Sequence, residues 1–425
     1  MPDGTATAHL YQPKLIAMLR EGYSAQFFRQ DILAGLTVAI VALPLSMAIA
    51  VASGVSPERG LYAAIVGGTL VSALGGSRYQ IGGPAGAFIV LVAATVASHG
   101  LDGLLLAVLL SGLFLTILGA LRIGSLIRHI PEPVIVGFTC GIAVTILASQ
   151  LKDLGGLTLT NEPGPLLPKL AALWSAIGTL NFTALELGLV SAAVIFLLRW
   201  WRPNWPGMLI AVVGASLAAA LLNLPIQTIG SRFGALPHGL PFPQVPHITF
   251  ETLWTILPAA LSFTLLGGIE SLLSAKVADT MTGRKHRSNM ELVAQGIANI
   301  GSALFGGISV TGTIARTATN VRAGARSPFA GILHAVFLLV FLVVVAPLAA
   351  YVPLAALAGV LVVVCWNMAE KREFGHLLQH WRNASVLLVT FGGTLLHDLT
   401  AGIIAGCMVA AALALYSRIV TRDAT

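Results

Sequence analysis

The sequence predicts an all-α membrane protein that crosses the bilayer many times. Hydrophobic residues make up 56% of the 425 residues and charged residues only 10%, whereas soluble domains carry about 25% charged residues. Apolar runs recur from Leu33 to Leu415, and about 20 such residues cross a bilayer of about 30 Å. The three cysteines lie in apolar runs without metal-ligand spacing, so buried packing is the simplest interpretation of them.

Fourteen transmembrane segments are expected in order along the chain. They cover residues 32–51, 60–76, 84–98, 102–121, 132–150, 182–200, 206–222, 251–280, 289–306, 313–324, 328–347, 352–368, 384–397 and 400–418. Residues 1–31 are a polar N-terminal segment, and residues 419–425 are a short tail. A loop at 223–250 separates the two sets of seven, and its five prolines oppose a regular helix.

The distribution of positive charge supports this count and orients the chain. Of the 24 Lys and Arg residues, Lys276 and Arg316 fall within segments and four lie on one face. The remaining eighteen lie on the other face. Because cytoplasmic loops are enriched in Lys and Arg, both termini are expected in the cytoplasm. The membrane is expected to be the inner membrane of the cell. Topology therefore explains the net charge of +7, and no nucleic-acid partner is expected.

The third and tenth segments are short and follow glycine-rich stretches. The third follows Gly82-Gly83 and begins at Pro84, and the tenth follows Gly306-Gly307 and Gly312. Each is the third segment in its set of seven. Because seven is odd, the second set must cross the membrane with the opposite orientation, so the sequence predicts a 7+7 inverted repeat with two half-helices. The alternative is that both stretches are loops between ordinary helices.

The two half-helices would place their N-termini near the bilayer midplane. Free N–H groups and the positive dipole end at a helix N-terminus favour anions, and Arg316 in the first turn of the tenth segment adds a full charge. Glu270 lies at membrane depth in the eighth segment, and Ser274 follows one turn later. We expect Glu270 to pair with Arg316 or Lys276, or to take up a coupling proton.

No hydrolase, zinc-protease or nucleotide-binding motif is present in the sequence. Ser271 and Lys276 are five residues apart on one helix and point in different directions. The chain is therefore expected to be neither an enzyme nor a pump driven by ATP, and to need no cofactor. Secondary transport of a small anion, or an anion channel, remains.

Five stretches of the sequence resemble the SulP sulfate permease (solute carrier 26) family of anion transporters. They are Ala42–Leu45, Ser53–Tyr62, Ile81–Phe88, Val277–Asp279 with Gln295–Asn299, and Thr313–Arg322. The resemblance implies a mobile core of segments 1–4 and 8–11, a gate of segments 5–7 and 12–14, and a homodimer. Many members end in a cytoplasmic STAS domain, and none is expected here after the fourteenth segment.

The resemblance also implies which residues face the anion. They are Leu45 and Ile49 of the first segment, Ala85, Gly86 and Ala87 with the adjoining Phe88, and Thr313, Ile314, Ala315 and Arg316. Glu270 and Ser274 would serve the coupling ion, a proton or sodium. Sodium-dependent bicarbonate carriers of the family have Asp and Thr at these two positions, so Glu and Ser favour a proton.

The function expected is therefore proton-coupled symport of a small anion of the sulfate, dicarboxylate or bicarbonate class, by an elevator-like movement of the core. The alternatives are a sodium-coupled bicarbonate carrier or an anion exchanger, then an anion channel or voltage-responsive motor, then a nucleobase permease. A nucleobase permease would need a second acidic residue beside Glu270.

Overall fold

The structure is a computed structural model that describes residues 11–124, 131–159, 163, 166–203, 205–246, 250–396 and 399–422. Almost all of these residues are helical, as the composition predicts. The elements are α2 (Lys14–Glu21), α3 (Ala25–Ala52), α4 (Pro57–Tyr62), a π-helical turn (Ala63–Gly67), α5 (Gly68–Leu74), β1 (Gly82–Gly83), a 3₁₀ turn (Gly86–Phe88), α6 (Ile89–Ala120), α8 (Glu132–Leu154), α9 (Leu166–Ser175), a second 3₁₀ turn (Ile177–Thr179), α10 (Phe182–Trp201), α11 (Gly207–Leu221), α12 (Ile229–Phe233), α13 (Phe250–Thr282), α14 (Ser288–Leu304), β2 (Thr311–Gly312), α15 (Ile314–Arg322), α16 (Phe329–Ala349), α17 (Leu354–Met368), α18 (Lys371–Leu377), α19 (Trp381–Leu396) and α20 (Leu399–Arg422).

Six helical stretches among the described residues have the length and apolar composition to cross a membrane. They are Ala25–Ala52, Gly86–Ala120, Glu132–Leu154, Phe182–Trp201, Thr252–Thr282 and Leu354–Leu377. Three further apolar stretches of 10–17 residues are Gly207–Leu221, Phe329–Val344 within α16 and Ala401–Leu415 within α20. Every expected segment coincides with helix, but several are too short or too interrupted to cross a bilayer of about 30 Å unaided.

The observed helix limits differ from the expected ones at two places. The first helix begins at Ala25 rather than at residue 32, because Ser24 caps it by accepting a hydrogen bond from the backbone N–H of Phe27 at 3.2 Å. The third and fourth segments form one continuous element, Gly86–Ala120, with a kink at Gly100. Gly100 has φ of 68°, a conformation that a side chain would oppose.

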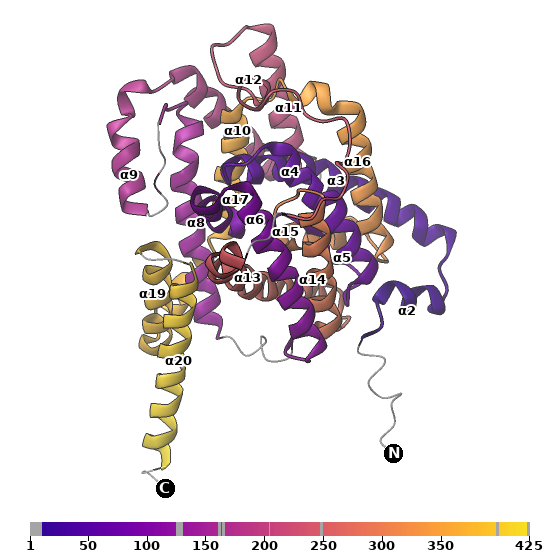
Figure 1. Cartoon of the computed structure of the whole chain (residues 1–425), viewed down its shortest axis with the longest axis vertical. Coiled ribbons are helices and arrows are strands. Elements are labelled where there is room, and N and C mark those ends of the chain that lie inside the picture. The colour runs from indigo at the N-terminus through magenta and orange to yellow at the C-terminus, as the bar shows by residue number, and fades with distance from the viewer. Residues whose placement is uncertain are drawn as a thin grey trace.

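The helices pack in two groups. In the first, α6 packs against α13 and α14, and α3 against α16. In the second, α8 packs against α17 and α19, α10 against α11 and α17, and α19 against α20. Contacts of α3 with α11 and α17 join the groups. Figure 1 shows this division, with α8, α19 and α20 on one side and α5, α14 and α16 on the other.

Close packing in the first group depends on small residues. A Cβ atom added at Gly112 of α6 would lie 2.6 Å from the carbonyl oxygen of Gly296 on α14. Glycine at both positions therefore lets the two backbones touch, as small residues do in membrane helix pairs generally.

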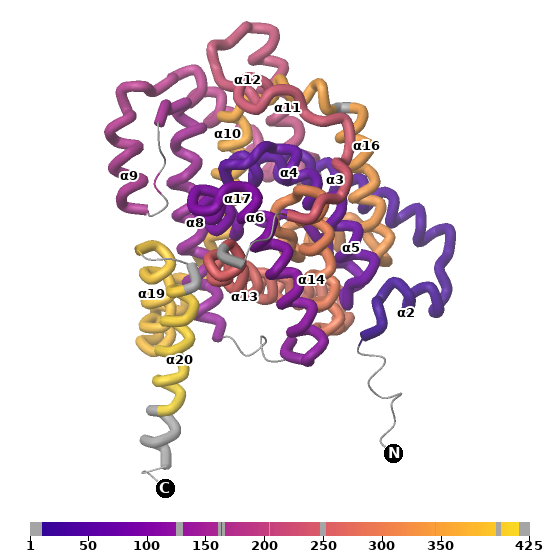
Figure 2. The backbone as a smooth tube through the Cα atoms, in the orientation of Figure 1, coloured from indigo at the N-terminus to yellow at the C-terminus, as the bar shows by residue number. Residues whose placement is uncertain are grey.

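The two long connections, before α10 and before α13, contain only short helices among the described residues. The apolar stretch 166–177 forms α9 and the start of the following 3₁₀ turn. The proline-rich connection holds the five-residue α12, which lies between Pro225 and Pro237. Figure 2 shows α9 and α12 at the upper end of the molecule and α19 and α20 extending from the lower end.

Candidate functional site

Two helix N-termini are brought together at the centre of the first group. Strand β1 pairs antiparallel with β2, with Gly82 opposite Gly312 and Gly83 opposite Thr311. The 3₁₀ turn that leads into α6 begins three residues after β1, and α15 begins two residues after β2. Because the strands are antiparallel neighbours, the chain leaves them in opposite directions and the two helices start on either side of one point.

Buried amide side chains hold this crossing in place. Asn299 of α14 donates to the carbonyl of Val310 at 2.8 Å and accepts from its N–H at 2.9 Å. Asn320 of α15 donates to the carbonyl of Tyr79 at 2.9 Å. Gln80 donates to the Ser271 hydroxyl of α13 at 2.9 Å. Irregular chain inside a membrane has no water to bond its backbone groups, so protein side chains must supply the hydrogen bonds. These amides serve that purpose around the two short strands.

Neither helix start is capped by a side chain. Thr313 is the N-cap residue of α15, but its hydroxyl lies 3.2 Å from the carbonyl oxygen of Ile81 and donates to it. The turn that starts at Gly86 also has no side-chain cap. The first N–H groups of both helices therefore remain available as donors, with the positive ends of the two helix dipoles beside them.

Arg316 is the largest fully buried side chain of the described chain, with 1% of its surface exposed. Its Nη2 donates to the Ser46 hydroxyl of α3 at 3.1 Å and to the Pro84 carbonyl at 3.3 Å. Its Nε and Nη1 have no hydrogen-bond partner among the described residues. A buried guanidinium with unpaired donors is costly, so this arrangement suits a site that receives an anionic group.

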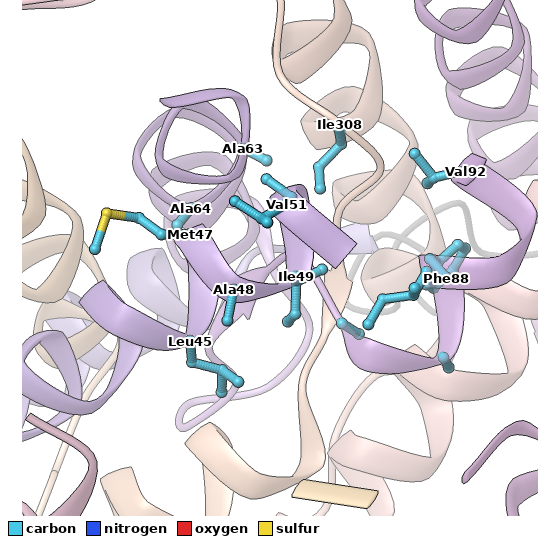
Figure 3. Packing of buried hydrophobic residues seen from close by; sticks show 14 of the residues in the cluster. Leu45, Met47, Ala48, Ile49, Val51, Ala63, Ala64, Phe88, Val92 and Ile308 are labelled. Carbon is cyan, nitrogen blue, oxygen red and sulfur yellow. The ribbon is translucent and has the colours of Figure 1, made fainter. Parts of the chain in front are cut away.

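The two helix starts, Arg316 and Glu270 line one cavity of about 300 Å³. Ten of the twelve residues predicted for the site border it: Leu45, Ile49, Ala85, Gly86, Ala87, Glu270, Thr313, Ile314, Ala315 and Arg316. Figure 3 shows Leu45 and Ile49 along α3, with Phe88 on a neighbouring segment. The sequence prediction thus gathered residues that are up to 271 positions apart around one space (Leu45 to Arg316).

Phe88 and Ser274 do not border the cavity. Phe88 is 2% exposed and stacks on Phe263 of α13, with ring centroids 5.8 Å apart. Ser274 is fully buried and its hydroxyl donates to Thr317 Oγ1 at 3.0 Å. The expectation that Ser274 faces the same space as Glu270 is therefore wrong, because the hydroxyl turns to α15 for a partner.

The carboxylate of Glu270 makes no hydrogen bond or ion pair with any described residue, and it is partly exposed to the cavity. The static pairs considered from the sequence, Glu270 with Arg316 and Glu270 with Lys276, are both absent from the described chain. Lys276 is exposed, one and a half turns further along α13. Glu270 is therefore free to change its protonation state or its partner.

The cavity is also lined by residues that the sequence prediction missed. They are Val41, Pro84, Thr139, Met208, Thr319, Val364, Asn367, Met368 and Glu370. Thr139, Met208 and the residues of α17 come from the second group of helices, so the cavity lies between the groups. Asn367 near the end of α17 and Glu370 just before α18 are polar, but polar residues at helix ends are common, so the sequence held no specific signal for them.

A second cavity continues from this space. Asn367 and Glu370 line both, and the second adds Arg199, Lys371 and Arg372. The Arg199 guanidinium donates to the side-chain oxygen of Asn367. Basic side chains at this opening raise the local concentration of anions.

The long apolar helices and the internal cavity lined by Arg316 and Glu270 are features of a multi-pass membrane transporter. The sequence model of the sulfate permease family matches residues 28–391. The chain belongs to this family, and the expectation that it is not an enzyme is confirmed by the relatives, which are named as transporters.

A curated relative supports the assignment. The chain is 43% identical over 394 residues to the protein named "Putative sulfate transporter YvdB" of Bacillus subtilis (strain 168). The alignment covers 92% of this chain and 74% of that protein.

Solved structures confirm the helical membrane fold. The transmembrane domain of the cyanobacterial bicarbonate transporter BicA superposes with a TM-score of 0.81 at 30% identity, over 90% of this chain and 98% of that one. The structure of SLC26A9 superposes with a TM-score of 0.89, over 97% of this chain and 69% of that one. Its identity is 19%, so it supports the fold alone.

Proposed function

We propose that the chain is a secondary active transporter that carries a small anion of the sulfate, bicarbonate or dicarboxylate class. The observation that carries the proposal is the cavity of about 300 Å³ that Arg316 lines together with two uncapped helix starts, while Nε and Nη1 of its guanidinium stay unpaired among the described residues. An oxyanion satisfies several of these donors at once. The names of the relatives, sulfate and bicarbonate transporters, support the same class of substrate.

The coupling ion in this proposal is a proton carried by Glu270. Its carboxylate borders the same cavity as Arg316 but is bonded to no described residue. A bare carboxylate beside a bound anion repels it, and protonation removes that repulsion. Proton and anion would therefore bind together, which is the requirement for symport.

The movement that we propose is elevator-like. The first group of helices would be the mobile core and the second group the gate, because the cavity lies between them. The two halves of the chain would form a 7+7 inverted repeat. One half-helix would begin after β1 and the other after β2. Both termini would be cytoplasmic in the cell membrane, as the distribution of Lys and Arg indicates. The homodimer implied by the family stays a prediction.

A second candidate is a sodium-coupled bicarbonate carrier or an exchanger. The likeness to the BicA transmembrane domain favours it. The position of Ser274 opposes it, since its hydroxyl is bonded to Thr317 and lies outside the cavity.

Uptake by proteoliposomes tests these alternatives. The purified chain is reconstituted, and labelled sulfate, bicarbonate and succinate are offered in parallel, each with and without an inward proton gradient and with sodium or potassium outside. Proton-coupled symport predicts accumulation of at least one anion that the proton gradient accelerates in either salt.

Three outcomes would change the conclusion. Uptake that requires sodium and ignores the proton gradient would select the second candidate. Uptake only against a counter-anion inside the vesicle would select exchange. Uptake of uracil and of no anion would overturn the anion assignment.

A further inference from the structure

A second positively charged cavity lies apart from the transport site. Its volume is about 260 Å³, and its charged lining comes from Lys14 of α2, Arg78 before β1, Asp279 at the end of α13, and Arg284, Lys285 and His286 of the next connection. None of these residues lines the cavity that contains Glu270 and Arg316. Transport of the anion, as proposed, gives this second cavity no role.

Two of its charged residues already have partners. Arg78 Nη2 forms a two-pronged pair with Glu21, at 2.5 and 2.6 Å from the carboxylate oxygens. Asp279 Oδ2 accepts from the backbone N–H of His286 at 3.1 Å and lies 2.7 Å from its ring Nδ1. Lys14, Arg284 and Lys285 form no ion pair with any described residue. Counting Glu21 and Asp279 against the four Lys and Arg side chains, and taking His286 as neutral, the cavity keeps an excess of two positive charges.

The environment of Lys14 reflects this excess. Partial burial lowers the pKa of its amine below the ordinary value, and the charges of Arg287 and Arg78 lower it further. Glu21 and Asp279 oppose the shift only in part. A bound anion would relieve the repulsion among these cations.

The cavity is rigidly built without any ligand. Glu291 Oε2 accepts from the N–H groups of Gly76 and Ser77 at 2.8 and 3.0 Å, which fixes the connection that carries Arg78. The Gly76 carbonyl accepts from Arg287 N–H at 2.9 Å, and the Gly75 carbonyl from Lys14 N–H at 2.9 Å. These bonds fix the backbone that carries the charged side chains, which lowers the ordering cost of binding an anion.

The surroundings of the cavity are those of a membrane surface. Helix α2 packs beside α5 (Figure 1) and exposes Ile16 and Leu19, which are 42% and 52% exposed. Phe27 and Phe28, in the first turn of α3, are 40% and 42% exposed. Short amphipathic helices with such apolar residues lie in the headgroup region of a bilayer. A site for a soluble anion has no need of this apolar border.

We propose that the cavity formed by Lys14, Arg284 and Lys285 binds the phosphate headgroup of an anionic phospholipid in the cytoplasmic leaflet. Clusters of Lys and Arg at the cytoplasmic ends of membrane helices attract such lipids. The acyl chains would lie against the apolar residues of α2 and the start of α3. The leaflet follows from the orientation given under the proposed function, whereas the binding itself depends only on the cavity.

Titration of the purified 425-residue chain in detergent with fluorescent phosphatidylglycerol tests the proposal, with phosphatidylcholine of the same chains and label for comparison. The double variant R284Q/K285Q and the single variant Lys14→Gln remove charges from the cavity. The matched control is R202Q/R382Q, which removes two exposed Arg that lie over Trp201 and Trp381. Each charge removed from the cavity is expected to weaken phosphatidylglycerol binding by about fivefold.

The expected result is tighter binding of phosphatidylglycerol than of phosphatidylcholine, weakened about fivefold in Lys14→Gln and about 25-fold in the double variant, and kept in the control. Equal binding of the two lipids, or an equal loss in the control, would overturn the proposal. Displacement of the lipid by millimolar inorganic phosphate would assign the cavity to a free anion instead. Anion uptake is measured separately, so failure here leaves the proposed transport function intact.

Discussion

Arg316 concentrates the chemistry of the proposed transport site in one side chain. It is 1% exposed and uses only Nη2 for hydrogen bonds within the described protein, to Ser46 and Pro84. These bonds fix the guanidinium plane while Nε and Nη1 remain unpaired. A guanidinium held this way keeps a fixed orientation and a permanent charge, which a flexible lysine side chain cannot copy.

Replacement of Arg316 tests this role. Arg316→Gln should weaken anion binding roughly 10- to 100-fold, since it removes a charged hydrogen bond of about 1.5–3 kcal/mol. Arg316→Lys should restore the charge but not the fixed planar guanidinium, and so recover only part of the affinity. Isothermal titration with the transported anion measures both variants. Wild-type affinity in Arg316→Gln would remove this residue from the site.

Glu270 is the residue on which proton coupling depends in the proposed function. Glu270→Gln imitates the protonated carboxyl group and cannot titrate, so anion uptake should persist while its acceleration by an inward proton gradient disappears. Proteoliposome uptake with and without the gradient measures this. A variant that still responds to the gradient would place the proton elsewhere.

Ser274→Ala is the matched control on the same helix. The Ser274 hydroxyl donates to Thr317 and lies outside the cavity. Its removal should cost about 1 kcal/mol of stability and leave anion affinity and proton coupling unchanged. Loss of a sodium response in this variant would instead revive the sodium-coupled alternative.

At the scale of elements, the two-residue strands β1 and β2 determine the site more than any long helix does. Their pairing sets the distance between the starts of α6 and α15, and the amides of Gln80, Asn299 and Asn320 replace a wider sheet. The space around the pair is full. A Cβ atom at Gly312 would lie 1.5 Å from the Gln80 amide nitrogen.

Gly312→Ala should therefore displace Gln80 and break its hydrogen bonds to Ser271. Overpacking of this kind costs about 1–3 kcal/mol, and the shift of β2 should lower anion uptake as well. Gly214→Ala is the control, because a Cβ atom there meets nothing within 4 Å and alanine favours the helix. Thermal unfolding in detergent compares the two. Equal melting temperatures would show that the crossing tolerates displacement.

At the scale of the whole molecule, the cavity lies between two helix groups. Relative movement of the groups would therefore change the side of the membrane to which the cavity opens. The basic opening at Arg199, Lys371 and Arg372 is expected on the cytoplasmic side. The exposed Phe242 of the proline-rich connection is expected on the outer side.

Labelling of single cysteines tests this orientation. In a background without Cys140, Cys365 and Cys407, an impermeant maleimide applied to intact cells should label Phe242→Cys, which is 89% exposed in the native protein. Gly375→Cys in α18 should react only after the cells are opened, although a Cβ atom there meets nothing within 4 Å. The reverse pattern would invert the topology.

The sequence by itself determined the membrane setting, the family resemblance and most of the predicted residues that line the central cavity. The composition and the apolar runs reflect the lipid that surrounds the chain. They can therefore be interpreted without knowing which residues are in contact. The glycines before Pro84 and Thr313 and the charges of Glu270 and Arg316 stand out locally, since irregular chain and charge inside a membrane are costly wherever they occur.

Only the tertiary structure decided which side chains face the cavity and which face the protein. Ser274 and Phe88 have the right positions along the chain, but their partners, Thr317 and Phe263, come from distant segments and turn them away. Asn367 and Glu370 enter the site because α17 packs across α3. The basic cavity at Lys14 was hidden for the same reason, since pairing with Glu21 and Asp279 selects which cations stay free. Contacts between distant segments, unlike solvent preference, leave no periodic signal along the chain.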